Sequence, residues 1–140
     1  MNTWIFQSVP ERYDLREINN IKPGEIVTWY ATRYRNEMTP GDIVYFWMGG
    51  EESIRGIYGS GVLTSPAYVK RNWDSHGVDV EIRARFKEPI PARVVKADLT
   101  LRGLLILRQP QATNFLLNTE EGEALSKIVK NSKEAASTRG

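Results

Sequence analysis

One segment of the sequence alternates between apolar and charged positions. Within Val78–Phe86, every second residue is apolar, and charged side chains occupy the positions between them. This period of two indicates a half-buried antiparallel β-strand with one face in the core and one face in solvent. We expect Arg83 and Arg85 on the solvated face, and we expect Pro89 and Pro91 to end the strand.

Other strands are predicted by continuous apolar runs. The strongest is Asp42–Trp47, an aromatic and β-branched run that follows Pro40-Gly41. Proline fixes φ and glycine tolerates φ > 0, so this pair predicts a tight turn, which Asp42 would close with its side chain. We predict further strands at Thr3–Gln7, Ile26–Tyr30, Ile54–Leu63, Leu104–Leu107 and Phe115–Leu117, with Trp4 in the core.

Glycines punctuate the predicted strand 54–63. Gly56, Gly59 and Gly61 stand inside it, and strand glycines mark bulges, barrel corners or places where a ligand approaches the backbone. An aromatic strand beside a glycine-rich strand could therefore form a flat slot. A nucleobase is a planar ligand that would suit such a slot.

Helical patterns are short. Glu11–Ile18 predicts an amphipathic helix or 3₁₀ turn, and Ala31–Met38 predicts a short basic helix. Thr119 would cap a final helix whose first turn is rich in glutamate. We expect one domain over residues 1–130, followed by a polar, disordered tail or linker over 131–140. Many strands and few helices predict a mixed α/β, mostly β fold: a small barrel with peripheral helices.

Composition excludes several classes of function. The 140 residues contain no cysteine, which excludes disulfides, thiolate metal sites and cysteine nucleophiles. His76 is the single histidine, and we expect it to be a polar turn residue. Adjacent glutamates lack the convergent partners of an acid–base or metal site. We therefore expect no enzyme activity and no cofactor, and we disfavour a metal-dependent hydrolase built on Asp42 or Glu51.

Charge and hydropathy limit the partners. The net charge is +2, which is too small for a non-specific polycation, so nucleic-acid binding would depend on a local basic patch and a pocket. The N-terminal segment lacks the pattern of a signal peptide, and no apolar run has membrane-spanning length. We expect a cytoplasmic protein.

Several segments, taken in order, resemble the EVE domain family. They run from near residue 3 to near residue 129 and are Trp4–Ser8, Trp29, Gly41–Trp47, Gly56–Gly61, Arg108–Phe115 and Thr119–Glu121. The resemblance implies a PUA-like fold, a curved β-barrel with small helices. EVE domains are similar to YTH domains, which bind methylated adenine in RNA through an aromatic cage. The resemblance thus implies recognition of a modified base, such as methylated cytosine or adenine, in DNA or RNA, and a fused or separate effector such as a nuclease.

The resemblance also implies a set of site residues. Trp29 would stack on the base, with Trp47 or Trp73 as a second face, and polar side chains would meet the base edge. The expected ligand-binding residues are Ser8, Trp29, Tyr30, Trp47, Trp73, Gln109, Thr113 and Asn114, and the expected contacts to the nucleic-acid backbone are Arg33, Arg35, Lys70 and Arg71. The chain departs from many relatives at Gln7, where they have lysine, and its basic segment after Trp29 is shorter.

Each of these residues also has a structural interpretation. Trp29 and Trp47 could be core residues, and Arg33 and Arg35 could be a solvated surface. The alternative function is a protein-interaction or regulatory module that keeps the barrel without a base pocket. It predicts a packed Trp29 without a basic rim around it.

The typical free energies of the expected contacts favour modest affinity for nucleic acid. Stacking contributes about 1–3 kcal/mol per base, extrusion of a paired base costs a few kcal/mol, and a buried methyl adds about 0.8 kcal/mol. We therefore expect micromolar binding. Avidity or a fused effector would be needed for a strong response to the modified base.

Overall fold

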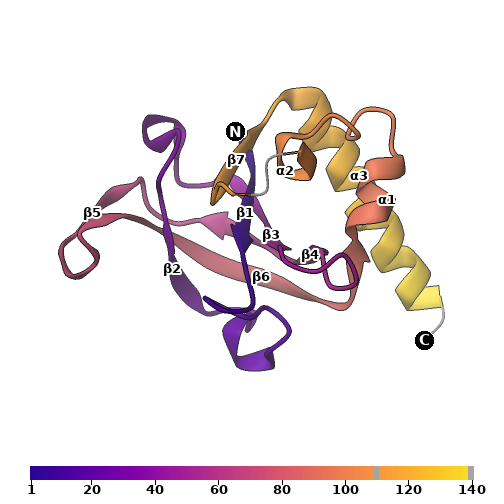
Figure 1. The fold of residues 1–140 in the computed structure, drawn as a ribbon, viewed down its shortest axis with the longest axis horizontal. Coiled ribbons are helices and arrows are strands. Elements are labelled where there is room, and N and C mark those ends of the chain that lie inside the picture. Colours follow the sequence, from indigo (N-terminus) through magenta and orange to yellow (C-terminus); the bar gives the residue numbers. More distant parts are fainter. Residues whose placement is uncertain (109–110, 139–140) are drawn as a thin grey trace.

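The fold is a curved β-sheet with helices packed against one side (Figure 1). The computed structural model describes residues 1–108 and 111–138. Within them, one seven-stranded sheet has the order β2-β6-β4-β3-β1-β7, and β5 pairs with β6 outside this path. The strands are β1 (Thr3–Ser8), β2 (Ile26–Tyr30), β3 (Ile43–Met48), β4 (Gly56–Leu63), β5 (Tyr68–Lys70), β6 (Ser75–Pro91) and β7 (Asn114–Leu117).

Short helical elements connect these strands, and a longer helix follows the sheet. The α-helices are α1 (Ala92–Ala97), α2 (Leu105–Arg108) and α3 (Thr119–Thr138), and the 3₁₀ turns are η1 (Ile18–Asn20), η2 (Arg35–Glu37) and η3 (Arg71–Trp73). In the part of the chain that the structure describes, no helix has both the length and the apolar character needed to span a membrane.

Two hydrophobic cores lie on the two faces of β1 and β3. Successive side chains of a strand point to opposite faces. Trp4 and Phe6 accordingly lie in the first core, inside the curve of the sheet, whereas Ile5 lies in the second core beneath the helices. In β3, Phe46 belongs to the first core and Trp47 to the second. Because both faces are covered, β3 consists of apolar residues, and β1 contains the buried apolar run Trp4–Phe6 followed by the buried polar residues Gln7 and Ser8.

A bulge in β6 exchanges the two faces of this long strand. Ile82 pairs with Gly61 and Ala84 pairs with Ser60, so β6 has one more residue than β4 at this point. An extra residue inverts the alternation beyond it. The predicted apolar face is therefore correct as far as Ile82, but Phe86 packs against the second core.

β6 ends at Pro91, as expected, but it passes through Pro89. The register passes from Gly59 opposite Arg85 to Ile57 opposite Ile90, and the several β6 residues between them form a larger irregularity. Pro89 lies within it, where the missing N–H does not interrupt a regular ladder. The strand therefore continues to Pro91.

The glycines of β4 allow neighbouring strands to approach and do not form a ligand slot. A Cβ atom on Gly59 would lie 2.4 Å from the carbonyl oxygen of Ala84, and one on Gly61 would lie 2.6 Å from that of Glu81. The facing aromatic residues of β3 are buried in the two cores. The expected flat slot between β3 and β4 is therefore wrong.

Three predicted elements differ from the structure. Leu104–Leu107 was expected as a strand, but the apolar run contributes to helix α2; short apolar runs do not distinguish the two by period. Ala31–Met38 contains only the turn η2. Glu11–Ile18 forms turns, and η1 begins at its last residue.

The start of the final helix also differs. Asn118, not Thr119, caps α3: its Oδ1 accepts from the N–H of Glu121 at 2.8 Å, and the Glu121 carboxylate accepts from the N–H of Asn118 at 2.9 Å. This reciprocal pair is a capping box. The helix continues to Thr138, and the expected domain boundary after residue 130, with a tail or linker over 131–140, stays a prediction.

Asp42 ties the start of β1 to the turn before β3. Its carboxylate is buried and accepts from the N–H of Thr39 at 3.1 Å, which confirms its role in closing the turn at Gly41, where φ is +98°. It also accepts from the indole N–H of Trp4 and the backbone N–H of Asn2, both at 3.0 Å. One carboxylate therefore satisfies three donors from two segments.

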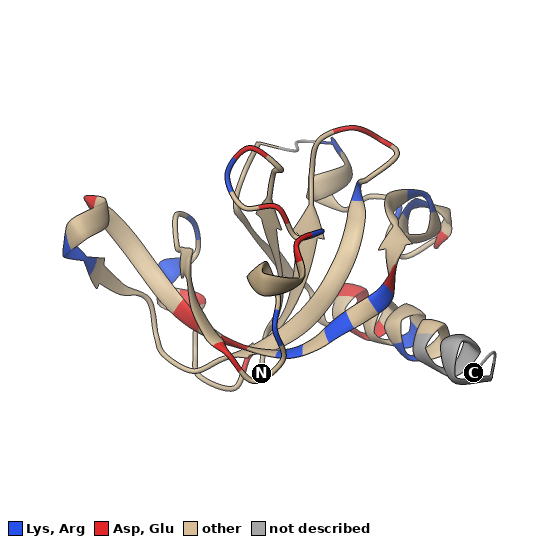
Figure 2. Ribbon diagram, turned by 90° about the horizontal axis from the view of Figure 1, so that it is seen from below, with Lys and Arg blue, Asp and Glu red and all other residues tan. Residues whose placement is uncertain are grey.

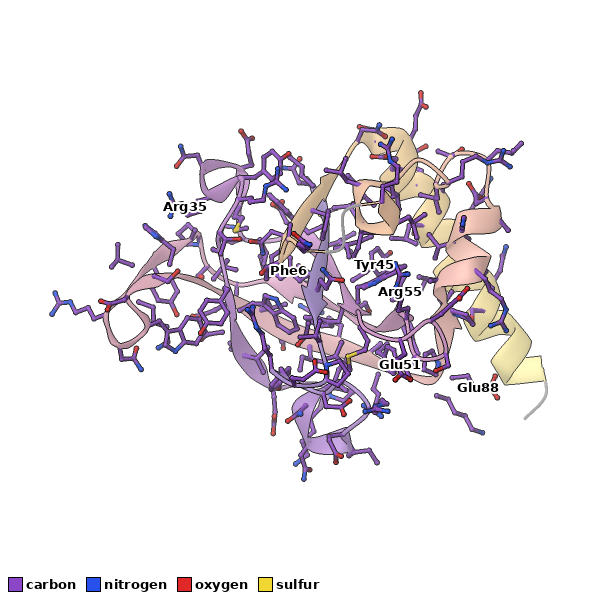
Figure 3. All side chains as sticks on the ribbon, in the orientation of Figure 1. Phe6, Arg35, Tyr45, Glu51, Arg55 and Glu88 are labelled. Atoms are coloured by element: carbon purple, nitrogen blue, oxygen red, sulfur yellow. The ribbon has the colours of Figure 1, made fainter. Side chains whose placement is uncertain are left out.

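We expect Asp42→Ala to lower the free energy of unfolding by about 3 kcal/mol, because it leaves the buried indole N–H and two backbone donors without their acceptor. Urea unfolding followed by circular dichroism measures the change. Glu51→Ala is the control, since Glu51 is exposed in the loop between β3 and β4 (Figure 3), and it should stay within about 0.5 kcal/mol of the wild type. Equal stabilities of the two variants would contradict the role assigned to Asp42.

Candidate functional site

A cavity of about 690 Å³ opens beside the free edge of β2. Its walls are β2, the end of β1 with the loop that follows, and residues 111–113. A further wall is the hairpin in which η3 joins β5 to the start of β6, called the β5–η3 hairpin below. Among the described residues, its lining has two charged members, Arg12 and Lys70, and both are basic. The lining residues are Gln7, Ser8, Val9, Arg12, Tyr13, Val27, Thr28, Trp29, Tyr30, Lys70, Trp73, Gln111, Ala112 and Thr113.

Trp29 forms an aromatic wall of this cavity and is itself largely packed. It is 7% exposed, and its ring centroid lies 5.3 Å from that of Phe46 and 6.1 Å from that of Phe6. Tyr13 meets it edge-on, with centroids 5.8 Å apart. The alternative function predicts a packed Trp29, as the structure has it. It does not predict a basic rim, whereas Arg12 and Lys70 line this cavity. Trp29 can therefore present only a small part of its surface to a ligand.

Hydrogen bonds hold the loop after β1 against the cavity. The Ser8 hydroxyl donates to the carbonyl of Tyr13 at 2.8 Å, and the Tyr13 hydroxyl donates to the carbonyl of Asn20. Burial, and secondly the charge of Glu25, raises the pKa of Tyr13 above its ordinary value, so this phenol stays protonated at neutral pH. Ser8 thus lines the cavity and also fixes the position of Tyr13.

The opposite wall is attached to β1 through Gln7. The Gln7 side-chain amide donates to the carbonyl of Ala112 at 2.7 Å, and its backbone N–H donates to the carbonyl of Thr113 at 2.8 Å. Thr113 lines the cavity, as predicted. Gln109, which we expected in the same wall, lies outside the described residues.

The free edge of β2 presents backbone hydrogen-bonding groups to the cavity. Ala31 donates its N–H to the carbonyl of His76 at 3.0 Å, which fixes the alternation of the antiparallel ladder. Thr28 and Tyr30 are then the residues whose N–H and C=O groups point away from β6. The carbonyl of Tyr30 accepts from Asn114 at 2.9 Å. The remaining edge groups of Thr28 and Tyr30 can pair with the polar edge of a planar ligand.

The rim of the cavity includes a stacked pair of aromatic rings. Tyr30 and Trp73 have centroids 4.4 Å apart, and Nζ of Lys70 lies 5.3 Å from the centroid of Trp73. Trp73, which we expected beside the cavity, is thus in its lining but is stacked on Tyr30. Arg71 is exposed in η3 next to this rim.

Asn114 is a structural residue and not a group available to a base edge. It is fully buried, and its Oδ1 accepts from the backbone N–H of Thr32 at 2.8 Å and of Arg33 at 3.4 Å, and from the Thr32 hydroxyl at 3.2 Å. Its Nδ2 donates to Tyr30. Asn114 therefore connects β7 to the end of β2, and our expectation of direct base contact is wrong for this arrangement.

Trp47 is likewise absent from the cavity. It is fully buried in the second core, because its position in β3, two residues after Tyr45, points it to the same face as Tyr45, beneath the helices. The expected contact between Trp47 and a base is wrong for this reason of strand parity.

The expected basic contacts are not gathered at one place. Arg33 lies over the ring of Tyr34 and lines a separate, smaller cavity beside α2. Nη1 of Arg35 lies 2.7 Å from Nδ1 of His76, at the periphery of the fold (Figure 3). Figure 2 shows lysines and arginines spread over the hairpin, β6 and the helices instead of forming one stripe. Of the four predicted backbone contacts, Lys70 is the one that lines the main cavity.

Sequence reasoning missed Arg12, Tyr13 and Gln111. The first two lie in a turn that has no periodic pattern, and Gln111 is the first described residue after position 108. Their proximity to Trp29 depends on how the loop after β1 folds back. Groups of three or more metal-ligating carboxylate or histidine side chains do not occur within residues 1–108 and 111–132, whose side chains the structure describes.

Comparison with known proteins agrees with this architecture. The family model for the EVE domain matches residues 2–128. No curated protein matches the sequence. A hypothetical protein from Leishmania major has a similar structure, with a TM-score of 0.72, 18% identity, and coverage of 97% of each chain.

Two similar structures contain nucleic acid. The human THYN1 protein in complex with DNA containing 5-methylcytosine has a TM-score of 0.73 and 17% identity, over 91% of this chain and 97% of that one. The YTH domain of the Zygosaccharomyces rouxii MRB1 protein, in complex with N6-methyladenosine RNA, has a TM-score of 0.55 and 13% identity, over 91% and 83%. These likenesses establish the fold, and the curved barrel expected from the PUA-like resemblance is confirmed.

We expect Asn114→Ala to lower the free energy of unfolding by about 2–3 kcal/mol in the absence of any ligand, because buried partners lose their hydrogen bonds. Chemical denaturation measures this. Asn36→Ala, an exposed asparagine in η2, should stay within about 0.5 kcal/mol of the wild type. If Asn114→Ala were as stable as this control, Asn114 would not be the connector described above.

Proposed function

Because this chain belongs to the EVE domain family, we propose that it is a nucleic-acid-binding reader domain that holds one modified nucleobase in the cavity beside β2. The observation that carries the proposal is the composition of that cavity. An aromatic wall, an unpaired strand edge and two basic residues surround one space. Methylated cytosine and methylated adenine are the bases we would test first.

The cavity is large enough for a base together with part of its sugar. Ligand sites in proteins typically occupy about 300–1,000 Å³, and the cavity of about 690 Å³ lies in this range. Trp29, Tyr13 and Val27 supply apolar contact, and the free groups of Thr28 and Tyr30 supply donors and an acceptor. A methyl group on the base would add contact with the apolar wall without requiring a new polar partner.

The basic residues lie where the sugar–phosphate chain would emerge. Arg12 comes from the loop after β1, and Lys70 comes from the β5–η3 hairpin across the cavity. Two cations on opposite walls can contact phosphates on either side of an inserted nucleotide. This assignment replaces the expected phosphate contacts of Arg33 and Arg35 with Arg12.

The function proposed is binding and not catalysis, with no cofactor, in a cytoplasmic protein. The limited exposure of Trp29 favours modest affinity, because little of the ring is available for stacking. Stacking of about 1–3 kcal/mol against a cost of a few kcal/mol for base extrusion supports binding near micromolar strength. We therefore also propose a fused or separate effector, such as a nuclease, that would add avidity. The structures with methylated DNA and with methyladenosine RNA make both polymers candidates.

One observation favours the alternative, a protein-interaction or regulatory module. Trp29 is packed against three other aromatic rings, as a core residue would be. A module of that kind would not need the cavity to be open. Blocking the cavity therefore separates the two functions.

We expect Thr113→Phe to reduce affinity for a modified oligonucleotide about tenfold, because the added ring occupies the cavity and removes stacking worth about 1–3 kcal/mol. The measurement is fluorescence anisotropy with short DNA and RNA carrying cytosine, 5-methylcytosine, 5-hydroxymethylcytosine, adenine or N6-methyladenine. Thr100→Phe makes the same change at an exposed threonine outside the lining, and it should bind as the wild type does.

The outcomes of this experiment distinguish the functions. Preference for one modified base in the wild type and in Thr100→Phe, but not in folded Thr113→Phe, is the expected result. Equal binding of every oligonucleotide, falling with salt, would leave only a basic surface. Absence of binding would favour the interaction module.

We expect Arg12→Gln to reduce the slope of log K against log[salt] by about 0.7–0.9, the value for one phosphate contact. Titrations at several salt concentrations give the slope. Arg93→Gln removes the same charge from an exposed position on α1 and should leave the slope near that of the wild type. Equal slopes for the two variants would show that Arg12 does not contact phosphate.

A further inference from the structure

Tyr30 and Trp73 form a stack on the outer side of β2, in which Tyr30 is exposed and Trp73 is half-buried. Their centroids lie 4.4 Å apart with an interplanar angle of 34°, and Nζ of Lys70 lies 5.3 Å from the Trp73 ring. Tyr30 is 43% exposed even though it is a large aromatic residue. Aromatic surface beside a cation is the combination on which proteins stack single-stranded bases.

This stack lies on the other side of the strand from Trp29. Trp29 and Tyr30 are consecutive in β2, so their side chains leave the strand in opposite directions. Trp29 points into the first core, against Phe6 and Phe46. Trp73 therefore stacks on Tyr30 and not on Trp29, although all three residues border the same cavity.

The hairpin is built to hold Trp73 close to β2. The hydroxyls of Tyr68 and Thr28 both donate to Oδ1 of Asp79, at 2.7 and 2.9 Å, which links the hairpin to the strand. The bond to Asp79 is the main cause that raises the pKa of Tyr68, so its hydroxyl remains a donor at neutral pH. A Cβ atom on Gly77 would lie 2.8 Å from Cγ2 of Thr28 and 3.5 Å from Trp73, so glycine leaves room for both.

We propose that Tyr30 and Trp73 form a second stacking site, which binds the nucleobase adjacent to the one in the cavity. Both residues also line the rim of the cavity, so the two sites adjoin across the free edge of β2. A nucleic-acid strand that crosses this edge places one base on each side of it. Lys70, at the cavity and beside Trp73, lies between the two bases and is positioned for the phosphate that joins them.

The inference rests on the proposed function and adds a requirement to it. The smallest ligand that fills both sites is a dinucleotide, and the second site selects by ring area and not by hydrogen-bond pattern. A purine next to the modified base should bind better than a pyrimidine, and an abasic residue should bind worst.

The test uses single-stranded DNA with one 5-methylcytosine and RNA with one N6-methyladenosine, each flanked on one side by adenine or by an abasic residue. We expect the abasic flank to lower wild-type affinity about tenfold on one side of the modified base. Tyr30→Leu and Trp73→Leu should lower affinity for the adenine-flanked probe by a similar factor and should no longer distinguish the two flanks. The preference for the modified over the unmodified base should be unchanged.

Tyr34→Leu is the matched control, because Tyr34 is an equally exposed tyrosine that lies over Arg33 and lines the other cavity. It should behave as the wild type. A second measurement places 2-aminopurine at the flanking position. At saturation its fluorescence should be lower with wild type than with Tyr30→Leu, because stacking on the ring quenches it.

Failure of this inference differs from failure of the proposed function. If Tyr30→Leu and Trp73→Leu lose the preference for the modified base while the flanking base still matters equally, the pair contacts the modified base and the second site is wrong. If wild type binds with no preference for either modification and Thr113→Phe changes nothing, the proposed function fails and the inference fails with it.

Discussion

The fold depends on the burial of β1 and β3 on both faces. These two strands run parallel at the centre of the sheet, and each sends alternate side chains into two different cores. Apart from Gln7 and Ser8 at the end of β1, which line the cavity, the two strands have their faces covered by the two cores and their edges paired with neighbouring strands. The cavity accordingly lies beside β2, the strand with a free edge.

The central strands could be predicted from the sequence because burial on both faces leaves a clear pattern. Thr3–Ser8 and Ile43–Met48 appear as apolar runs, and a Pro-Gly turn marks the start of the second. What could not be predicted was the parity of β6 beyond Ile82, since a bulge changes no residue type and yet exchanges the faces. The run 104–107 was also ambiguous, because four apolar residues fit a buried strand and one turn of helix equally well.

Six of the residues that the resemblance implies for the site lie around one cavity, and their role in binding stays a prediction. Strand parity or side-chain bonding keeps two others away from it. Ser8, Trp29, Tyr30, Lys70, Trp73 and Thr113 come together around one cavity. Trp47 is excluded by its position in β3, and the Asn114 amide is occupied by bonds to the backbone after β2. No sequence pattern predicts such hydrogen bonds, because an asparagine in a polar segment gives the same sequence signal whether or not its side-chain amide is hydrogen-bonded to the backbone.

The two hydrogen bonds to the Asp79 carboxylate affect how the hairpin of β5 and β6 is held at the mouth of the cavity. A two-stranded hairpin is marginally stable by itself, and the hairpin of β5 and β6 is attached to β2 through the pairing of β6 with β2 as far as Gly77. One oxygen of this carboxylate accepts from both Thr28 and Tyr68, so it adds a side-chain link between β5 and β2 to the backbone ladder. The time for which an occupant stays bound would then be governed by how often that shared acceptor releases one of its two donors, and not by contacts with the occupant alone.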